Sequence, residues 1–413
     1  MKRGACCQHR MNRMPPAPAR PSFARGSVIG RMGWIRSGRE VYGPWECGTV
    51  EAMIRSITLQ NFKSFGVKQT VHLEPISVLV GPNNSGKSNL MSVGQFVMDC
   101  VLKNVNNTML DAGFENVRHR PSKDGDVISL GWKSDEGRYW VDFVIRDEKA
   151  RTLMEGSENL DGSFSAAGER GGEPFQLIHR MIRPPIQGRG IWQPLMKSRM
   201  VHLSLDALRQ DAQFVVEPRL TGSGSDMAAV VAFWRGAFPG KAAQLDEFLQ
   251  KCLPELKFVL ARPSQQQGLF RLWVEQKNGE RFDARRISDG VLCFIGLAMH
   301  IIDAEPGAIL FVEEPERSIH PQRLHDLVEL MRTASHERKC QFILSTHSPV
   351  LLDAFRDEPE AIVLFRRSET PDQSTLVRRM TELPALMRAL GRAQPGEMLE
   401  TGLFSENFQD LEA

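Results

Sequence analysis

The chain has 413 residues, of which 41% are hydrophobic and 25% are charged, a composition typical of a globular protein that buries a large core. Its 52 basic and 50 acidic side chains nearly cancel, which excludes a strongly basic protein dedicated to nucleic-acid binding. The seven cysteines form no Cys-x-x-Cys pair and no run of 18 apolar residues occurs, so neither structural zinc nor a membrane partner is expected. These features favour a cytoplasmic protein.

Residues 1–52 differ in composition from the rest of the chain. They carry nine basic and three acidic side chains, are rich in Arg, Pro, Gly and Met, and lack helical or strand periodicity. This pattern predicts a disordered basic tail, or a segment that precedes the true start of translation. A transit peptide is a third alternative, although the prolines and glycines disfavour its amphipathic helix. The remaining residues carry 43 basic and 47 acidic side chains and are mildly acidic.

Regular patterning begins at Met53. Segments 54–59 and 69–73 alternate apolar and polar residues, as half-buried strands do. The apolar segment 76–80 predicts a buried strand that leads directly into Gly81.

A helix is expected next, from 88 to 101, and a β-hairpin from strands 126–132 and 138–145 with its turn at 135–137. Residues 146–190 are rich in Gly, Glu and Ser and are expected to form a loop.

The second half of the chain is more regular. Helical spacing is present over 226–258, and segment 270–276 alternates like a strand. From Ile287 to Phe365, helices alternate with apolar strands at 308–312, 341–345 and 361–365. This alternation predicts an α/β fold with a mostly parallel sheet covered by helices.

Residues 81–88, Gly-Pro-Asn-Asn-Ser-Gly-Lys-Ser, match the Gly-x-x-x-x-Gly-Lys-Ser/Thr pattern of a phosphate-binding P-loop. The expected strand before it and helix after it are the context that this motif requires. Glycine permits the tight turn that aims backbone N–H groups at phosphate oxygens, and the helix N-terminus adds partial positive charge. Lys87 is expected to reach the β- and γ-phosphates and Ser88 to ligate Mg²⁺, so the motif predicts nucleotide binding.

Polar residues follow two of the buried strands. Glu313 and Glu314 end the strand 308–312, where one carboxylate can hold Mg²⁺ and the other can orient or deprotonate water. His347 follows the strand 341–345, where it can hydrogen-bond a γ-phosphate or the attacking water. A solvated acidic turn and a structural histidine are the alternatives.

Ser288, Asp289 and Gly290 precede an apolar helix. Ser288 is expected to be its N-cap, and the start of a helix can bind an anion. Taken alone, this segment is a helix cap.

The order of these motifs resembles that of ABC-type ATPases in the branch that contains RecF, the SMC proteins and the OLD-type ATPases. The segments 54–65, Ile-Arg-Ser-Ile-Thr-Leu-Gln-Asn-Phe-Lys-Ser-Phe, and 313–321, Glu-Glu-Pro-Glu-Arg-Ser-Ile-His-Pro, also resemble this branch. The resemblance covers residues 53–367. It implies a P-loop NTPase with an N-terminal antiparallel β subdomain, and ATP and Mg²⁺ as cofactors.

The resemblance also assigns the site residues. It implies that Ser88 and Glu313 hold the metal, that Glu314 is the catalytic glutamate and that His347 is the switch histidine. Residues 318–320 correspond to the D-loop. In the family, the signature motif of one subunit closes on ATP held by the other, so a homodimer is implied. The implied ATP-binding residues are Gly81, Pro82, Asn83, Asn84, Ser85, Gly86, Lys87, Ser88, Asn89 and the signature residues Ser288, Asp289 and Gly290.

The sequence departs from the family pattern at two of these positions. Glu313 stands where Asp is commoner, and Cys293 stands where related sequences often carry Arg. Arg285 and Arg286 are candidate substitutes for that arginine, with a solvated basic turn as the alternative. Arg118 and Arg120 are weaker candidates for contacts with ATP or DNA.

The resemblance divides the chain into the tail 1–52, a first ATPase part 53–145, an inserted helical or lid region 146–284, a second ATPase part 285–367 and a helical tail 368–413. It implies a RecF-like ATPase of DNA repair. The alternative is the ATPase of an anti-phage defence system that regulates a partner effector without touching DNA. No SMC-type arms are expected, and the 66 residues after His347 show no acidic nuclease constellation. Trp132, Trp140 and Trp234 are expected in the core rather than stacked on bases.

Overall fold

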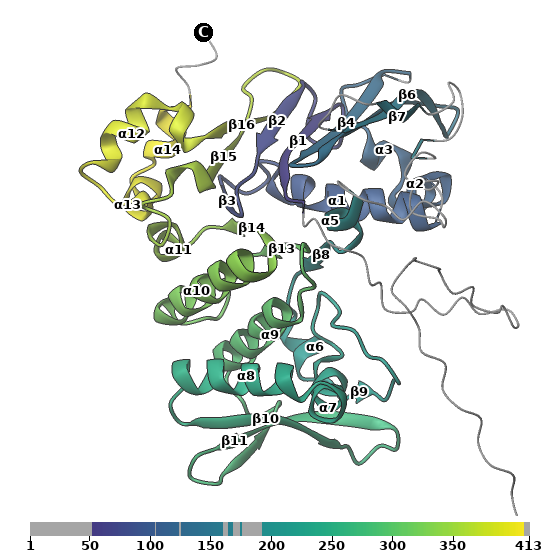
Figure 1. The fold of residues 1–413 in the computed structure, drawn as a ribbon. Helices are drawn as coiled ribbons and strands as arrows, with labels where there is room; N and C mark the ends of the chain where they lie inside the picture. The colour runs from purple at the N-terminus through teal and green to yellow at the C-terminus, as the bar shows by residue number, and fades with distance from the viewer. Residues whose placement is uncertain are drawn as a thin grey trace, which may run out of the picture. The chain divides into compact units, whose positions relative to one another are not determined.

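The computed structural model describes residues 52–103, 105–123, 125–159, 164–167, 174–175 and 192–408. The expected tail, apart from Ala52, lies outside the described residues. From Thr49 onward the chain forms one compact unit, drawn in Figure 1. Among the described helices, none combines the length and apolar character needed to cross a membrane.

A six-stranded, mostly parallel sheet lies at the centre of the described chain. Its strand order is β16-β15-β3-β14-β13-β8, and only β16 runs antiparallel to its neighbour. All five residues of β3 are buried, as expected of a strand covered on both faces. The strands are β3 (Ile76–Val80), β8 (Arg199–Val201), β13 (Ile309–Glu313), β14 (Gln341–Thr346), β15 (Ile362–Arg367) and β16 (Thr375–Arg379). The predicted α/β fold with a parallel sheet is confirmed.

Successive residues of the central strands enter two different cores. Val78 and Val80 pack into one core with the helices α9 and α10, whereas Leu79 packs into the other with α1. This alternation follows from the two-residue period of a strand. Helices that contribute residues to these two cores include α1 (Lys87–Lys103), α2 (Val105–Ala112), α3 (Phe114–Val117), α5 (Trp192–Met196), α6 (Leu205–Leu208), α9 (Asp289–Asp303), α10 (Pro321–Arg338) and α11 (Pro349–Asp353).

A second, antiparallel sheet has the order β2-β1-β4-β5-β6-β7. The predicted hairpin is present, and its two strands pair from Val127↔Val144 to Ser134↔Gly137. The strands are β1 (Ile54–Gln60), β2 (Gln69–His72), β4 (Val127–Ser134), β5 (Gly137–Arg146), β6 (Lys149–Asn159) and β7 (Phe164–Ala167). The expected N-terminal antiparallel β subdomain is therefore confirmed.

The expectation that 146–190 is a loop is wrong for β6 and β7. β6 pairs with β5 along its whole length, although its sequence is rich in polar residues and contains a glycine. The buried Glu155 accepts a hydrogen bond from the hydroxyl of Tyr139 at 2.9 Å, and a Cβ at Gly156 would lie 2.5 Å from the ring of Trp140. These residues resemble loop residues by composition, but here they pair with the preceding strand β5. The rest of the predicted loop, other than 174–175, lies outside the described residues.

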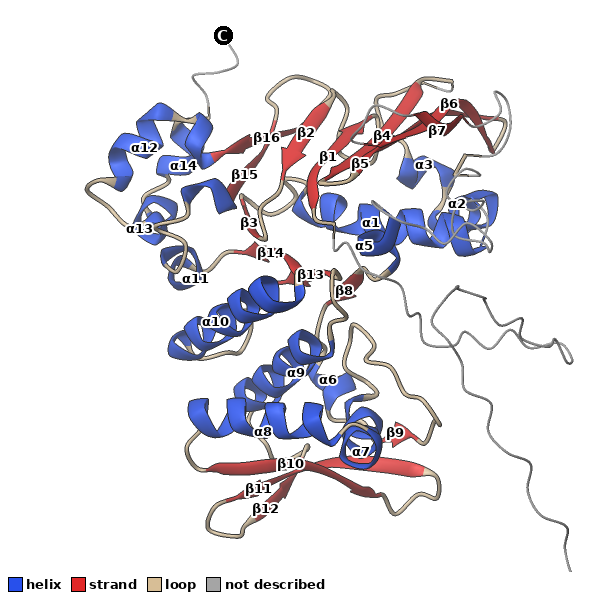
Figure 2. Cartoon of the chain, in the orientation of Figure 1, coloured by secondary structure: helices blue, strands red, loops and turns tan. Residues whose placement is uncertain are grey.

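A third sheet has the order β10-β11-β12, with β9 paired to β11, and α7 and α8 pack on it (Figure 2). The predicted helical segment 226–258 ends early, because α8 stops at Cys252 and Pro254 precedes a strand. Residues 146–284, expected as a helical or loop insert, thus supply strands to all three sheets. The elements are α7 (Met227–Ala237), α8 (Pro239–Cys252), β9 (Ala212–Gln213), β10 (Leu256–Pro263), β11 (Leu269–Gln276) and β12 (Arg281–Asp283).

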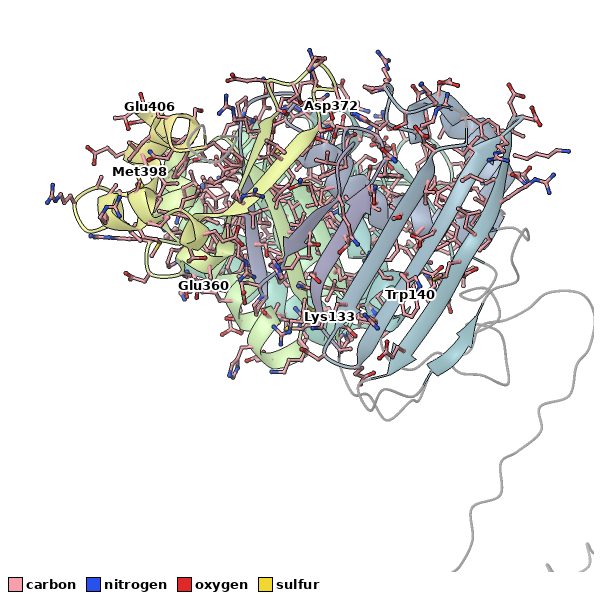
Figure 3. The ribbon with its side chains drawn as sticks, turned by 90° about the horizontal axis from the view of Figure 1, so that it is seen from above. Lys133, Trp140, Glu360, Asp372, Met398 and Glu406 are labelled. Atoms are coloured by element: carbon pink, nitrogen blue, oxygen red, sulfur yellow. The ribbon has the colours of Figure 1, made fainter. Side chains whose placement is uncertain are left out.

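The C-terminal segment contains a strand as well as the expected helices. β16 pairs with β15 from Val363↔Arg379 to Arg367↔Thr375. The helices are η1 (Pro359–Ala361), η2 (Met380–Glu382), α12 (Pro384–Leu390), α13 (Pro395–Glu400) and α14 (Leu403–Glu406). Figure 3 shows Met398 and Glu406 on these helices, away from Lys133 and Trp140 on the antiparallel sheet.

Candidate functional site

The P-loop, residues 81–88, connects β3 to α1, as the motif predicts. A Cβ at Gly81 would lie 2.1 Å from the carbonyl oxygen of Phe365, and a Cβ at Gly86 would lie 2.3 Å from Oγ1 of Thr375. Both glycines also have positive φ, 156° and 108° respectively. Glycine is therefore required at both positions because the loop is wedged against β15 and β16.

Lys87 is 7% exposed, and its ammonium group donates hydrogen bonds to the carbonyl oxygens of Gly81 at 2.6 Å and Pro82 at 2.9 Å. Burial lowers the pKa of Lys87 to about 8, although the negative charges of Glu314 and Glu316 act in the opposite direction. Backbone carbonyl groups of the P-loop therefore fix the Lys87 ammonium, and the two carboxylates favour its protonated form.

Side chains outside the P-loop also hold it in place. Ser64 accepts hydrogen bonds from the side chains of Asn89 and Thr375, each at 2.8 Å. Oγ1 of Thr375 also lies 2.9 Å from the carbonyl oxygen of Ser85, which can accept the same hydroxyl proton in place of Ser64. The role of Thr375 was missed by the sequence analysis, because this residue lies 290 positions after Ser85 and belongs to no motif.

The Walker B acids, Glu313 and Glu314, lie at the same edge of the sheet as the P-loop. The register pairs Glu313 with Ser345 and Thr346 with Val80, so β13, β14 and β3 end side by side. The carboxyl ends of parallel strands form the usual ligand-binding edge of an α/β sheet. The structure therefore brings together motifs that are more than 200 residues apart in the sequence.

The two Walker B acids have different surroundings. Oε2 of Glu313 lies 3.0 Å from Nδ1 of His202, just beyond β8, and the Glu313 side chain is 19% exposed. Glu314 is exposed and has a φ of 44°, a left-handed conformation that turns the chain out of the strand. His202 has no signal in the sequence, since its segment carries no recognisable motif.

His347 lies directly after β14 and is exposed. Partial desolvation of the imidazole ring and the charge of Lys87 lower the pKa of His347, while the charges of Glu314 and Glu316 oppose this shift. Because β3, β13 and β14 end side by side, the predicted P-loop lysine, catalytic glutamate and switch histidine all lie at the same edge of the sheet.

The signature residues contact a different set of elements. Ser288 occupies the N-cap position of α9, as expected, but its side chain makes no capping hydrogen bond. A Cβ at Gly290 would lie 2.5 Å from the carbonyl oxygen of Ser318, so the signature motif packs closely on the D-loop, residues 318–320. Asp289 forms an ion pair with Arg209, which follows α6.

Arg209 is therefore a further candidate beside the signature motif, in addition to Arg285 and Arg286. Arg285 lies 3.8 Å from Asp211 instead, and Arg286 is exposed. Cys293 is buried, and burial raises the pKa of its thiol while the charge of Arg209 lowers it. The sequence analysis missed Arg209 because this residue lies 80 positions before Asp289 and meets it only in the folded chain.

The other sequence candidates lie elsewhere. Trp132 and Trp234 are buried in the cores, as expected. Trp140 is half-buried, and the guanidinium of Arg138 lies 5.1 Å from its ring centre. Arg118 pairs with Glu115 at 2.7 Å, and Arg120 is exposed.

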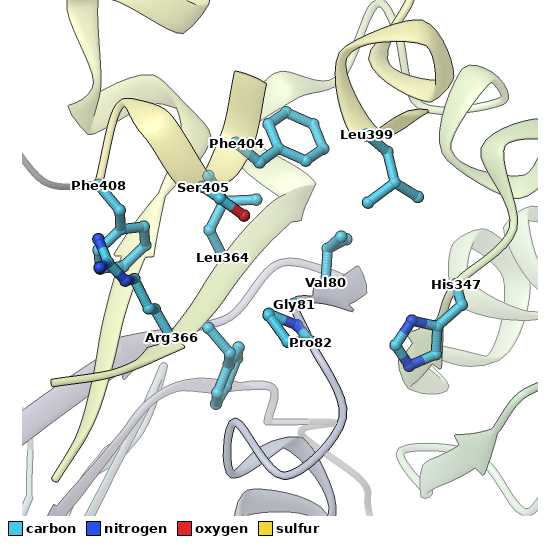
Figure 4. A pocket seen from close by; sticks show the side chains of 11 residues that line it. Val80, Gly81, Pro82, His347, Leu364, Arg366, Leu399, Phe404, Ser405 and Phe408 are labelled. Carbon is cyan, nitrogen blue, oxygen red and sulfur yellow. The ribbon is translucent and has the colours of Figure 1, made fainter. Parts of the chain in front are cut away.

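A cavity beside the P-loop separates it from the C-terminal helices. Gly81, Pro82 and His347 line one part, and Leu399 and Phe404 line another (Figure 4). Apolar side chains of the C-terminal helices and residues of the P-loop therefore line the same cavity.

The donor set fits a magnesium nucleotide. The exposed Ser88 hydroxyl and the Glu313 carboxylate supply the hard oxygen ligands that Mg²⁺ prefers, with water completing its shell. Oγ of Ser85 is buried and has no hydrogen-bond partner among the described residues, and a phosphate oxygen would satisfy it. Among the described residues, no group of three or more His, Cys, Asp or Glu is arranged to hold a metal ion.

The fold is that of the ABC-type P-loop ATPases. A family model described as "AAA ATPase domain" matches residues 53–123, which contain the P-loop. A second, described as "AAA domain, putative AbiEii toxin, Type IV TA system", matches residues 201–353, which contain the signature, the Walker B acids and His347.

Two individual proteins are similar to the chain. An OLD nuclease from Thermus scotoductus is 22% identical over 346 residues, which cover 75% of this chain and 62% of that protein. A crystal structure of an SMC head bound to the C-winged helix domain of ScpA aligns with a TM-score of 0.50 and 13% identity over 80% of this chain and 99% of that one. These similarities support the resemblance to the RecF/SMC/OLD-like branch of the ABC-type ATPases.

Proposed function

We propose that the chain binds ATP with Mg²⁺ and hydrolyses it between two copies of itself. The observation that carries this proposal is that β3, β13 and β14 end side by side, so that Lys87, Glu314 and His347 follow neighbouring strand ends at one edge of the sheet. A lysine that binds phosphate, a carboxylate for water and a histidine for the γ-phosphate are the parts that phosphoryl transfer to water requires.

Each residue has a distinct role in this proposal. Lys87 exchanges the carbonyl oxygens of Gly81 and Pro82 for phosphate oxygens, which its buried ammonium binds strongly. Glu314 orients the attacking water and accepts its proton, and His347 donates a hydrogen bond to the γ-phosphate. Ser88 and Glu313 would hold Mg²⁺, which neutralises phosphate charge when bound.

The signature motif completes the site of a second copy. Asp289 and Ser288 are exposed at the start of α9, where backbone N–H groups and the helix dipole favour an anion. Arg209 adds a fixed positive charge beside them. We infer a homodimer in which the signature motif of each copy closes on the ATP held by the other.

For the cellular role, we propose an ATP-driven switch in DNA repair or genome maintenance. The resemblance to the RecF/SMC/OLD-like branch supports this role. The chain spans 62% of the length of the OLD nuclease that it matches, so the nuclease activity of that protein is not part of the proposed function.

The second candidate role is the ATPase of a defence system that controls a partner effector without binding DNA. The description of the family model over residues 201–353, which names a toxin of a type IV toxin–antitoxin system, favours it. In this role, ATP-dependent dimerisation changes the surface that the effector contacts.

The test is ATP hydrolysis by the purified chain with and without DNA, together with the Lys87→Ala variant. Hydrolysis that requires Mg²⁺ and Lys87 supports the ATPase. DNA affinity that rises with ATP and falls with salt supports the first role. An active dimer that binds no DNA leaves the defence role, and an inactive parent protein contradicts the proposed ATPase.

A further inference from the structure

The side chain of Glu316 holds the segment that carries His347. Its Oε1 accepts hydrogen bonds from Oγ1 of Thr346 and from the backbone N–H of His347, both at 2.8 Å. The Thr346 hydroxyl in turn accepts a hydrogen bond from the N–H of Ser348 at 2.9 Å. One carboxylate therefore supports three consecutive residues at the end of β14.

This support is partly buried. Thr346 is 0% exposed, and Oε2 of Glu316 is buried with no hydrogen-bond partner among the described residues. A buried carboxylate oxygen without a partner carries a free-energy cost, which the protein tolerates more readily where the group has a function. The arrangement is thus costly for a residue whose only task is to link two loops.

Glu316 also stands between the signature motif and His347. It lies two residues before Ser318, whose carbonyl oxygen is in close contact with Gly290. Contacts therefore run without a break from the start of α9, through the D-loop backbone and the Glu316 carboxylate, to His347. A shift of α9 against the D-loop would move the acceptor that fixes the His347 backbone.

We propose that Glu316 is a positioning residue, which sets the position of His347 and couples it to the contact between the signature motif and the D-loop. This inference rests on the proposed ATPase function. It assigns to Glu316 no contact with the reacting atoms.

The physical consequence of losing Glu316 follows from its contacts. Alanine removes the acceptor, so the Thr346 hydroxyl and the His347 N–H must find new partners and the loop moves. Glutamine keeps an oxygen at the same distance along the side chain and can still accept both hydrogen bonds. A displacement of about 1 Å at a catalytic group lowers rates about 100-fold.

The kinetic test is a double-mutant cycle with His347. We expect Glu316→Ala to lower kcat about 10- to 100-fold with KM changed less than about threefold, and Glu316→Gln to retain most of kcat. In a His347→Ala background, Glu316→Ala should change kcat less than about threefold, because its effect passes through His347. Effects that multiply in the double variant would overturn the proposal, as would a normal kcat in folded Glu316→Ala.

A matched control comes from the same segment of chain. Glu337 is exposed near the far end of α10, about 24 Å of helix beyond Pro321. Glu337→Ala should leave kcat and KM unchanged. If Glu316→Ala does not fold, Glu316→Asp takes its place, because aspartate keeps the charge but is too short to hold both donors.

An NMR measurement on protein with ¹⁵N-labelled histidine tests the positioning without any nucleotide. The backbone signal of His347, identified by its loss in His347→Ala, should shift in Glu316→Ala and stay near its parent position in Glu316→Gln. An unchanged signal in Glu316→Ala overturns the proposal. A parent protein that does not hydrolyse ATP contradicts the proposed function instead, and the NMR result still decides whether Glu316 positions His347.

Discussion

The backbone N–H of Glu314 donates a hydrogen bond to the carbonyl oxygen of Ser345 at 3.0 Å. This bond extends the pairing of β13 and β14 by one residue, while the positive φ of Glu314 turns the chain out of the sheet. The backbone of Glu314 is thus fixed by its neighbour strand and its side chain is exposed. A fixed backbone beneath an exposed carboxylate suits a group that must orient water.

The first prediction concerns Glu314→Gln. Glutamine keeps the size of the side chain but removes the base, so ATP should bind normally while kcat falls about 100-fold or more. The unreacted ATP should hold the dimer together, and size-exclusion chromatography with light scattering should show an ATP-dependent dimer. Normal hydrolysis by Glu314→Gln would show that another residue is the base.

The second prediction concerns the pH dependence of nucleotide binding. The pKa of Lys87 is about 8 in the folded protein, and only the protonated ammonium binds phosphate well. The dissociation constant of a non-hydrolysable ATP analogue should be constant below pH 8 and rise about tenfold per pH unit above it. Titration calorimetry between about pH 6.5 and 9.5 measures the dissociation constant over the range in which the lysine loses its proton.

The control for this pH dependence is Lys87→Arg. Arginine stays protonated throughout the range, so any affinity that this variant retains should lack the inflection near pH 8. A parent protein whose affinity is flat up to pH 9.5 would contradict the lowered pKa.

The third prediction compares two arginines near the signature motif. Arg209→Ala removes the partner of Asp289 and should raise the ATP concentration needed for dimerisation roughly tenfold, a loss of about 1.4 kcal/mol. Arg285→Ala should have little effect, because Arg285 is exposed and lies near Asp211 instead. Both are measured in the Glu314→Gln background by light scattering. A larger effect of Arg285→Ala would favour Arg285, one of the two candidates that the sequence offered.

The fourth prediction concerns Gly290→Ala. The added Cβ would lie 2.5 Å from a backbone oxygen of the D-loop, so α9 or the D-loop must move. Hydrolysis and dimerisation should fall while the affinity of Lys87 for nucleotide in the monomer stays within about threefold of the parent. Binding by the monomer is measured by titration calorimetry.

Gly236→Ala in α7 is the matched control for Gly290→Ala. Nothing lies within 4 Å of its added Cβ, and the same change within a helix should be neutral or stabilise the fold by up to about 1 kcal/mol. Equal activity of both alanine variants would show that the contact between Gly290 and Ser318 is dispensable.

The elements that were predicted correctly carry strong local patterns. The apolar strand at β3 and the hairpin β4–β5 have hydrophobic periods that their own residues define. β6 was missed because its polar residues are satisfied by a partner strand, with Glu155 bonded to Tyr139. The end of α8 was misplaced because apolar residues continue past Pro254 at a spacing that suits a helix as well as a strand.

The sequence alone determined the P-loop, the Walker B acids, the signature motif and their order along the chain. Each motif is a short stretch of adjacent residues with a characteristic chemistry, so it can be recognised from the sequence alone. Only the tertiary structure brought Arg209 to Asp289, Thr375 to the P-loop and the Glu316 carboxylate to His347. Contacts of this kind depend on which strands and helices become neighbours, and that depends on packing across the whole core.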